Sequence, residues 1–195
     1  MSKRSIFSAL VFSAALFSTS AFAQGMYIAG DLGNAVPSSI KSDLDSQLAA
    51  LGNANINSSM TNGTAMSGAL GYQFNQNFAV EAGYFNSGTL TYSGTATGKT
   101  LKFESKLTGM RLGVLGTAPL TDKFSLVGKL GYSFNTVESK GTSNTTSITI
   151  SETMNGLDYG VSAMYKLVDN ISVKIGYESV ANKVNALLVG VQIKF

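Results

Sequence analysis

The sequence predicts an all-β fold, an eight-stranded, antiparallel, up-and-down transmembrane β-barrel preceded by a cleaved signal peptide. Runs of alternating polarity recur eight times along the chain, and a period of two is typical of a strand with two unlike faces. Only 13% of the residues are charged, while 21 are glycine; a water-soluble domain normally carries about 25% charged residues. The last run of alternating polarity ends in a phenylalanine, Phe195.

Residues 1–23 have the three parts of a secretory signal peptide. They begin with two basic residues near the N-terminus, continue with an apolar core over residues 6–17, and end in Ala-Phe-Ala, which fits an A-x-A cleavage site. The apolar core is shorter than the roughly 20 residues that a membrane-spanning helix needs. We therefore expect export and cleavage, with residues 24–195 forming one barrel domain.

The alternating segments can be assigned as strands in chain order. The clearest covers residues 171–178, where Ile, Val, Ile and Tyr alternate with Ser, Lys, Gly and Glu. Each segment can provide the 9–11 residues that a tilted strand needs to cross a bilayer. The eight segments lie at about 26–33, 65–74, 78–86, 103–117, 124–135, 157–167, 171–178 and 187–195.

The connections between these strands alternate in length. Short turns are expected at 75–77, 118–123 and 168–170, whereas the other connections are long and polar, except for a short one near 181–184. Outer-membrane barrels have short periplasmic turns and longer external loops. We therefore expect both termini on the periplasmic side. The long external loops are expected at about 34–64, 87–102 and 136–156.

One face of the predicted strands carries ionisable side chains. Inside a soluble barrel these groups would occupy the hydrophobic core, at a high cost in free energy. Inside a membrane barrel the apolar face meets lipid, and the acids and bases can pair in the interior. We predict that they form ion pairs there, and that they would gate the lumen if it conducts. The seven residues are Asp31, Glu81, Arg111, Lys129, Asp158, Lys174 and Glu178.

Three segments carry a family resemblance. Residues 68–84, 107–132 and 159–177 resemble turn-linked strand pairs of the outer membrane protein A-like transmembrane domain, and the chain is similar to the small eight-stranded, opacity-type outer-membrane barrels. The resemblance implies residence in the bacterial outer membrane. It also implies interior salt bridges that close the lumen and that, in some members, exchange partners to open a narrow channel.

Individual residues match or depart from this family pattern. The resemblance places Glu81, Arg111, Lys129 and Lys174 at its interior charged positions. Met164 stands where the family often has an interior carboxylate, which puts partner exchange in doubt. The terminal Phe195 resembles the assembly signal read by the barrel-assembly machinery.

Several function classes find no support in the composition. The chain has no histidine and no cysteine, so the histidine-dependent chemistry used by outer-membrane barrel enzymes is closed to it. No residues have metal-ligand spacing. Without the signal peptide, 12 basic and 11 acidic residues remain, so the charge does not indicate nucleic-acid binding. We expect no catalytic residue, cofactor or metal.

The first long loop contains a helical pattern. Ile40, Leu44, Leu48 and Leu51 recur at helical spacing and are followed by Gly52, which is typical of a helix end. This short helix is expected to lie against the barrel rim, to pack against another protein or lipid, or to fold into the barrel mouth as a lid.

Two functions follow from this fold. The first is a structural and surface-interaction scaffold whose loops contact lipopolysaccharide, other cells or host molecules, since loops on a rigid framework commonly carry function. The alternative is a narrow, charge-gated channel for ions or small solutes. An eight-stranded barrel is only wide enough for its own side chains, so a wide porin is excluded.

Overall fold

The computed structural model of the protein describes residues 25–50, 57–96, 99–143 and 146–195. The expected signal peptide, residues 1–23, and Leu51 of the helical pattern lie outside the described residues.

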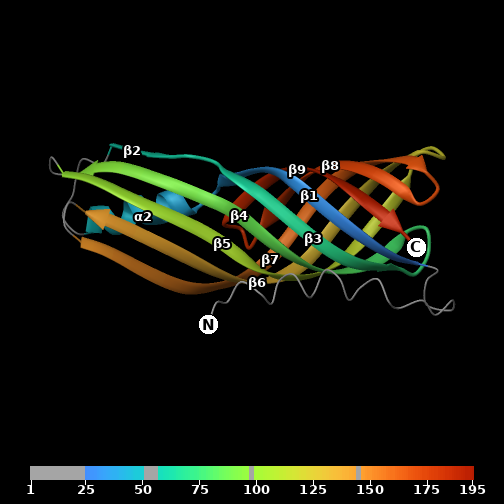
Figure 1. Cartoon of the computed structure of the whole chain (residues 1–195), viewed down its shortest axis with the longest axis horizontal. Helices are drawn as coiled ribbons and strands as arrows, with labels where there is room; N and C mark the ends of the chain where they lie inside the picture. The colour runs from blue at the N-terminus through green and yellow to red at the C-terminus, as the bar shows by residue number, and fades with distance from the viewer. Residues whose placement is uncertain (1–24, 51–56, 97–98, 144–145) are drawn as a thin grey trace, which may run out of the picture.

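Eight strands form a closed antiparallel barrel (Figure 1). Each pairs with its neighbours in sequence, and the first and last strands pair to close the ring. The expected up-and-down barrel is therefore confirmed. The strands are β1 (Met26–Pro37), β3 (Gly63–Gln73), β4 (Phe78–Ala96), β5 (Lys99–Pro119), β6 (Phe124–Ser143), β7 (Thr146–Val168), β8 (Ile171–Val180) and β9 (Val184–Lys194).

Two further elements lie between β1 and β3. Helix α2 (Ile40–Ala50) covers the expected helical pattern, and the short strand β2 (Asn57–Met60) pairs with β4 beyond the barrel wall. None of the described helices is long and apolar enough to cross a membrane.

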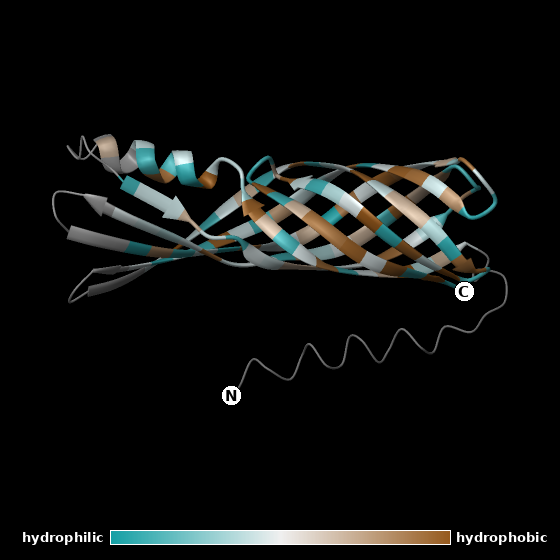
Figure 2. Ribbon diagram, turned by 90° about the horizontal axis from the view of Figure 1, so that it is seen from above, coloured by the Kyte–Doolittle hydropathy of each residue, from teal (hydrophilic) through white to brown (hydrophobic). Residues whose placement is uncertain are grey.

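Strand alternation places apolar side chains on the outer wall. Leu32, Leu70 and Leu130 are each more than 50% exposed, which would be unfavourable in water but suits a wall that faces lipid. Figure 2 shows hydrophobic segments concentrated over the barrel and paler ones over its extension. Aromatic side chains, including Phe78 and Phe134, stand outward towards the two ends, as expected for rings at membrane–water interfaces.

The long connections differ from the sequence-based expectation. Residues 87–102 and 136–156, expected as loops, mostly continue the strands: β4 runs to Ala96, β5 starts at Lys99, β6 runs to Ser143 and β7 starts at Thr146. Their polar composition is typical of loops, but here it belongs to strands. The outer face of these strand extensions meets water instead of lipid and therefore carries polar side chains. We call the extension the protruding sheet; it comprises β2 and residues 87–96, 99–108, 136–143 and 146–157.

At the opposite end of the barrel, which we call the short-turn end, tight turns connect the strands. The side chain of Asn75 accepts hydrogen bonds from the backbone N–H groups of Asn77 and Phe78, and the hydroxyl of Thr121 accepts one from the N–H of Phe124. Asn and Thr stabilise turns in this way. The short β8–β9 turn, at the other end of the barrel, contains Ala181 and Asn182 at positive φ.

Candidate functional site

The barrel interior is filled by three layers of side chains. The layer nearest the short-turn end is an apolar group that we call the turn-end cluster, with Met164 packed against it. A cavity of about 20 Å³ lies beside this cluster, enough for roughly one water molecule. The cluster consists of Tyr27, Ala29, Ala79, Leu115 and Val127.

The middle layer contains all seven predicted interior charges, which we call the ionic network. Arg111 Nη1 lies 2.6 Å from Glu178 Oε2, and its Nε lies 4.0 Å from Asp158 Oδ2. Lys129 Nζ lies 3.2 Å from Glu81 Oε2 and 3.7 Å from Glu178 Oε1. These contacts join β4, β5, β6, β7 and β8 across the lumen.

A fifth ion pair lies beside these four contacts. Lys174 Nζ is 3.1 Å from Asp31 Oδ1, which joins β8 to β1. Arg111 is 3% exposed and Asp158 2%, so both groups have lost most of their hydration. Groups this deeply buried are tolerated only when they are paired and hydrogen-bonded.

Hydrogen bonds balance the excess of acid in this layer. The network holds four carboxylates and three cations, and Asp158 makes its short contacts with neutral donors. Its Oδ1 accepts hydrogen bonds from the hydroxyl of Ser133 at 2.7 Å and from the backbone N–H of Ala181 at 2.9 Å. The latter bond ties the strained β8–β9 turn to the ionic network.

Uncharged residues that sequence reasoning missed connect the layers. The hydroxyl of Tyr27 donates to Glu81 Oε1 at 3.0 Å, which links the turn-end cluster to the ionic network. Ser67 accepts from Arg111 Nη2 at 3.0 Å and lies 3.3 Å from Asp31 Oδ2. Tyr27 and Ser67 lie on the inward face of their strands, so alternation was the signal that could have found them.

The third layer is an apolar group at the mouth of the barrel, the mouth cluster. Arg111 links it to the ionic network, because its guanidinium carbon lies 5.2 Å from the centre of the Phe85 ring. The mouth cluster consists of Ala35, Ile40, Ala65, Phe85, Leu90, Leu107, Val137, Val180, Val184, Ala186 and Leu188.

Helix α2 contributes directly to this closure. Ile40, in the first turn of the helix, is 7% exposed and belongs to the mouth cluster, and Leu44 packs against it. Leu48 lies in the helix, but its side chain falls outside the described part of the chain. The first turn of the helix therefore covers part of the barrel mouth, and Ile40 is buried by residues of this chain.

Asp45 anchors the second half of the helix to the protruding sheet. It accepts hydrogen bonds from Tyr92 at 2.5 Å and Ser58 at 2.7 Å, and it pairs with Lys41 at 2.7 Å. Burial raises the pKa of this carboxyl, but the hydrogen bonds from Lys41, Tyr92 and Ser58 outweigh that effect and lower the pKa to about 2. A second anchor is the ion pair between Asp43 and Lys183 at 2.8 Å.

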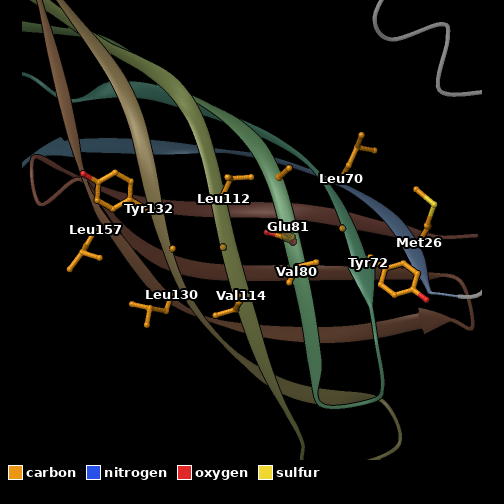
Figure 3. A pocket seen from close by; sticks show the side chains of 14 residues that line it. Met26, Leu70, Tyr72, Val80, Glu81, Leu112, Val114, Leu130, Tyr132 and Leu157 are labelled. Carbon is orange, nitrogen blue, oxygen red and sulfur yellow. The ribbon is translucent and has the colours of Figure 1, made fainter.

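An open apolar groove lies on the outer wall of the barrel and has a volume of about 710 Å³. Figure 3 shows side chains such as Leu70, Leu112 and Leu130 lining it from neighbouring strands, with the Glu81 carboxyl beneath. Because this wall is apolar throughout, lipid chains would fill the groove. It lacks the convergent polar groups of a substrate site.

The described residues do not provide the parts of a metal site. Among them, no three Asp, Glu, His or Cys side chains lie where they could hold a metal ion. The ionic network instead uses its acids to bind Arg and Lys within the barrel.

Solved structures of similar fold include two bacterial proteins. Neisserial surface protein A is 17% identical, with a TM-score of 0.53, and the match covers 88% of this chain and 97% of that one. Ail of Yersinia pestis, crystallised with the heparin analogue sucrose octasulfate, is 15% identical, with a TM-score of 0.50 and coverage of 88% and 99%. No curated protein matches the chain.

A family model provides the assignment that these structures cannot make alone. The model, described as the outer membrane protein beta-barrel domain, matches residues 6–195. This range includes every strand of the barrel and all seven residues of the ionic network. The chain therefore belongs to the outer membrane protein β-barrel domain family and resides in the bacterial outer membrane.

Proposed function

We propose that the protein is a surface-interaction scaffold that uses a closed barrel to present the protruding sheet and helix α2. The observation that carries this proposal is the filled interior. The turn-end cluster, the ionic network and the mouth cluster follow one another along the lumen, and helix α2 inserts Ile40 into the last of them. A barrel blocked in this way is suited to support and not to transport.

The orientation follows from the lengths of the connections. Outer-membrane barrels place short turns in the periplasm and longer connections outside the cell, so the protruding sheet is expected to point outward. Its strands are hydrogen-bonded along their length. The sheet is therefore a rigid surface for a partner. Because the sheet is already ordered, it loses little conformational entropy when a partner binds.

The charge of the outward parts limits the kind of ligand. Ail has been crystallised with a highly sulfated heparin analogue, but the outward parts of this chain carry a net charge of only +1. That near-neutrality favours ligands bound by serine and threonine hydroxyls, such as the sugars of lipopolysaccharide or of a host cell surface. The ionisable residues are Lys41, Lys99, Lys102, Lys106, Lys140 and Lys183, against Asp43, Asp45, Glu104, Glu138 and Glu152.

The test is to display the protein on a non-adherent Gram-negative host and to measure attachment to lipopolysaccharide-coated beads and to cultured cells. A matched variant has both long hairpins shortened to the barrel rim. We expect it to fold, as judged by heat-modifiable gel migration, and to lose attachment. Equal attachment by the full and shortened proteins would contradict the proposal.

One observation favours the alternative of a narrow, charge-gated channel. Lys129 lies between two carboxylates, at 3.2 Å from Glu81 and 3.7 Å from Glu178, and a cation shared in this way has a second partner available. The test is single-channel recording of the refolded mature chain in planar bilayers. Discrete openings that change with Glu81→Ala or Lys174→Ala would support a channel, and a silent membrane would support the scaffold.

We also propose a route to the membrane. Residues 1–23 would direct export, and Phe195 would be read by the barrel-assembly machinery. Phe195 is 65% exposed and its backbone N–H donates to Met26 at 3.0 Å, so its ring is available at the barrel seam. Phe195→Ser should lower the amount of folded protein in the outer membrane, whereas Val191→Ser, in the preceding strand β9, should not.

An enzyme is not favoured. The chain lacks histidine and cysteine, and the buried acids and bases of the ionic network bind one another.

A further inference from the structure

The protruding sheet has an open edge along β7. Residues 146–165 of β7 pair with β6 on one side, but pairing with β8 on the other side begins only at Tyr159. Asp158 and Gly156 still contact the β8–β9 turn. Within the described ranges, no strand pairs with the remaining outer edge of β7, which leaves residues 146–155 as an open edge.

This edge has few of the features that normally prevent strands from associating. Natural proteins protect exposed edges with lysine, proline, bulges or very short strands. Residues 149–155 read Thr-Ile-Ser-Glu-Thr-Met-Asn, with one charge and no proline or lysine. Their pairing with β6 has no register shift, so no bulge turns the edge away. Ile150 is 61% exposed. The unpaired backbone N–H and C=O groups can therefore accept a further strand.

We propose that this edge binds the same edge of a second copy of the protein on an opposing cell, by antiparallel strand pairing. The inference rests on the proposed outward orientation of the protruding sheet. β7 runs from the tip of its hairpin back towards the barrel, so a copy in a facing membrane runs in the opposite direction. A copy in the same membrane runs in the same direction. Only the facing copy can form an antiparallel, two-fold symmetric pair.

The sequence of the edge is compatible with pairing to itself. A two-fold axis through Ser151 would place Thr149 opposite Thr153 of the second copy, and such hydroxyl pairs stabilise adjacent strands. The same axis would place Glu152 opposite Ile150. With this axis, Glu152 of one copy does not face Glu152 of the other copy. An axis through Glu152 would place the two carboxylates directly opposite each other. Like charges directly opposite each other would be destabilising.

Charge does not oppose this association. The outward parts of one copy carry six lysines and five acids, so two copies meet with little net repulsion. A Thr- and Ser-rich strand with a single charge, such as this edge itself, therefore fits better than a polyanion or a charged lipid surface.

Vesicle clustering tests the proposal on the refolded mature chain. Two populations of phosphatidylcholine vesicles with different dyes, both containing the protein, should cluster together. Ser151→Lys should slow clustering about tenfold or more, because two lysines would face each other at the axis. The control is Thr136→Lys, which adds the same charge to the same face on β6, a strand paired on both sides. Equal clustering by Ser151→Lys and the native protein would overturn the proposal.

Cysteine cross-linking tests the geometry, since the chain has no cysteine. Ser151→Cys in two size-tagged copies, in separate vesicles mixed before oxidation, should form a mixed disulfide, and Thr136→Cys should not. Dimers that form equally in vesicles kept too dilute to meet, or clustering with protein-free vesicles, would overturn the opposing-cell pairing. In either case, loss of attachment by the shortened hairpins would still support the scaffold function separately.

Discussion

The ring of Tyr27 lies across Gly71, its direct partner in the β1–β3 register. A Cβ atom on Gly71 would overlap this ring, so the absence of a side chain on β3 is what allows Tyr27 to lie flat and reach Glu81. A glycine on one strand and an aromatic residue on the next thus determine the link between two layers of the lumen.

Gly71→Ala should therefore destabilise the barrel by about 1–3 kcal/mol, the usual cost of overpacking. The measurement is urea unfolding in detergent, followed by circular dichroism. Gly68→Ala is the matched control, because no atom lies within 4 Å of the position its Cβ would take on the outer wall. Equal stability of the two variants would show that the Tyr27 ring moves aside freely.

Lys129→Met should destabilise the fold by about 3 kcal/mol, because removing one member of a buried ion pair leaves carboxylates without their partner. Here Glu81 loses its cation and keeps the Tyr27 hydroxyl. Lys166→Met is the control, since its pair with Asp169 is exposed and such pairs contribute about 0–1 kcal/mol. Similar unfolding free energies for both variants would mean that the ionic network adds nothing to stability.

Acid should release helix α2 from the protruding sheet. The pKa of Asp45 is lowered to about 2 from its ordinary 3.8, so the carboxylate stabilises docking above pH 3.8 and the effect is lost as the pH falls from 3.8 towards 2. The protection of the helix amides against hydrogen exchange, relative to an unfolded chain at the same pH, should fall over that interval.

Asp45→Asn should remove this pH dependence and give about tenfold faster exchange at neutral pH, as expected for loss of a charge-assisted hydrogen bond. Glu104→Gln, whose pair with Lys102 is exposed, is the control and should leave exchange unchanged. An unaltered pH profile in Asp45→Asn would assign the release to another group.

Ile40→Ala should loosen helix α2 by about 2–4 kcal/mol, the range for truncating a buried aliphatic side chain. Limited proteolysis within residues 38–62 measures this effect. The barrel should stay electrically silent, because the ionic network and turn-end cluster still fill the lumen. Ile150→Ala, at an exposed position, should change neither readout, and currents through Ile40→Ala would support the channel alternative.

Alternation predicted which charges lie inside the barrel but could not predict their pairing. Whether Arg111 meets Glu178 or Asp158 depends on the stagger between strands that are not neighbours, and that stagger is a property of the closed barrel. Glu178 is 67 residues away along the chain. Local sequence holds no information about such a contact.

The protruding sheet was missed for a different reason. The pattern of lipid-facing residues ends near Phe134, and beyond it threonine, serine, lysine and glutamate occupy the outer face. Leu90, Leu107 and Val137 nevertheless continue the inward alternation and are buried. The alternation on the inward face alone predicts the full length of these strands.

The strands end at unequal heights. β4, β5, β6 and β7 continue into the protruding sheet, whereas β8 and β9 meet at a turn between Val180 and Val184. The molecule therefore has a tall side and a low side when viewed parallel to the membrane plane. Rotation about that normal decides which side a neighbouring protein or sugar chain meets, so crowding in the membrane can screen the tall side without touching the barrel. The orientation of the barrel within the plane of the membrane is thus a variable that controls access to the sheet.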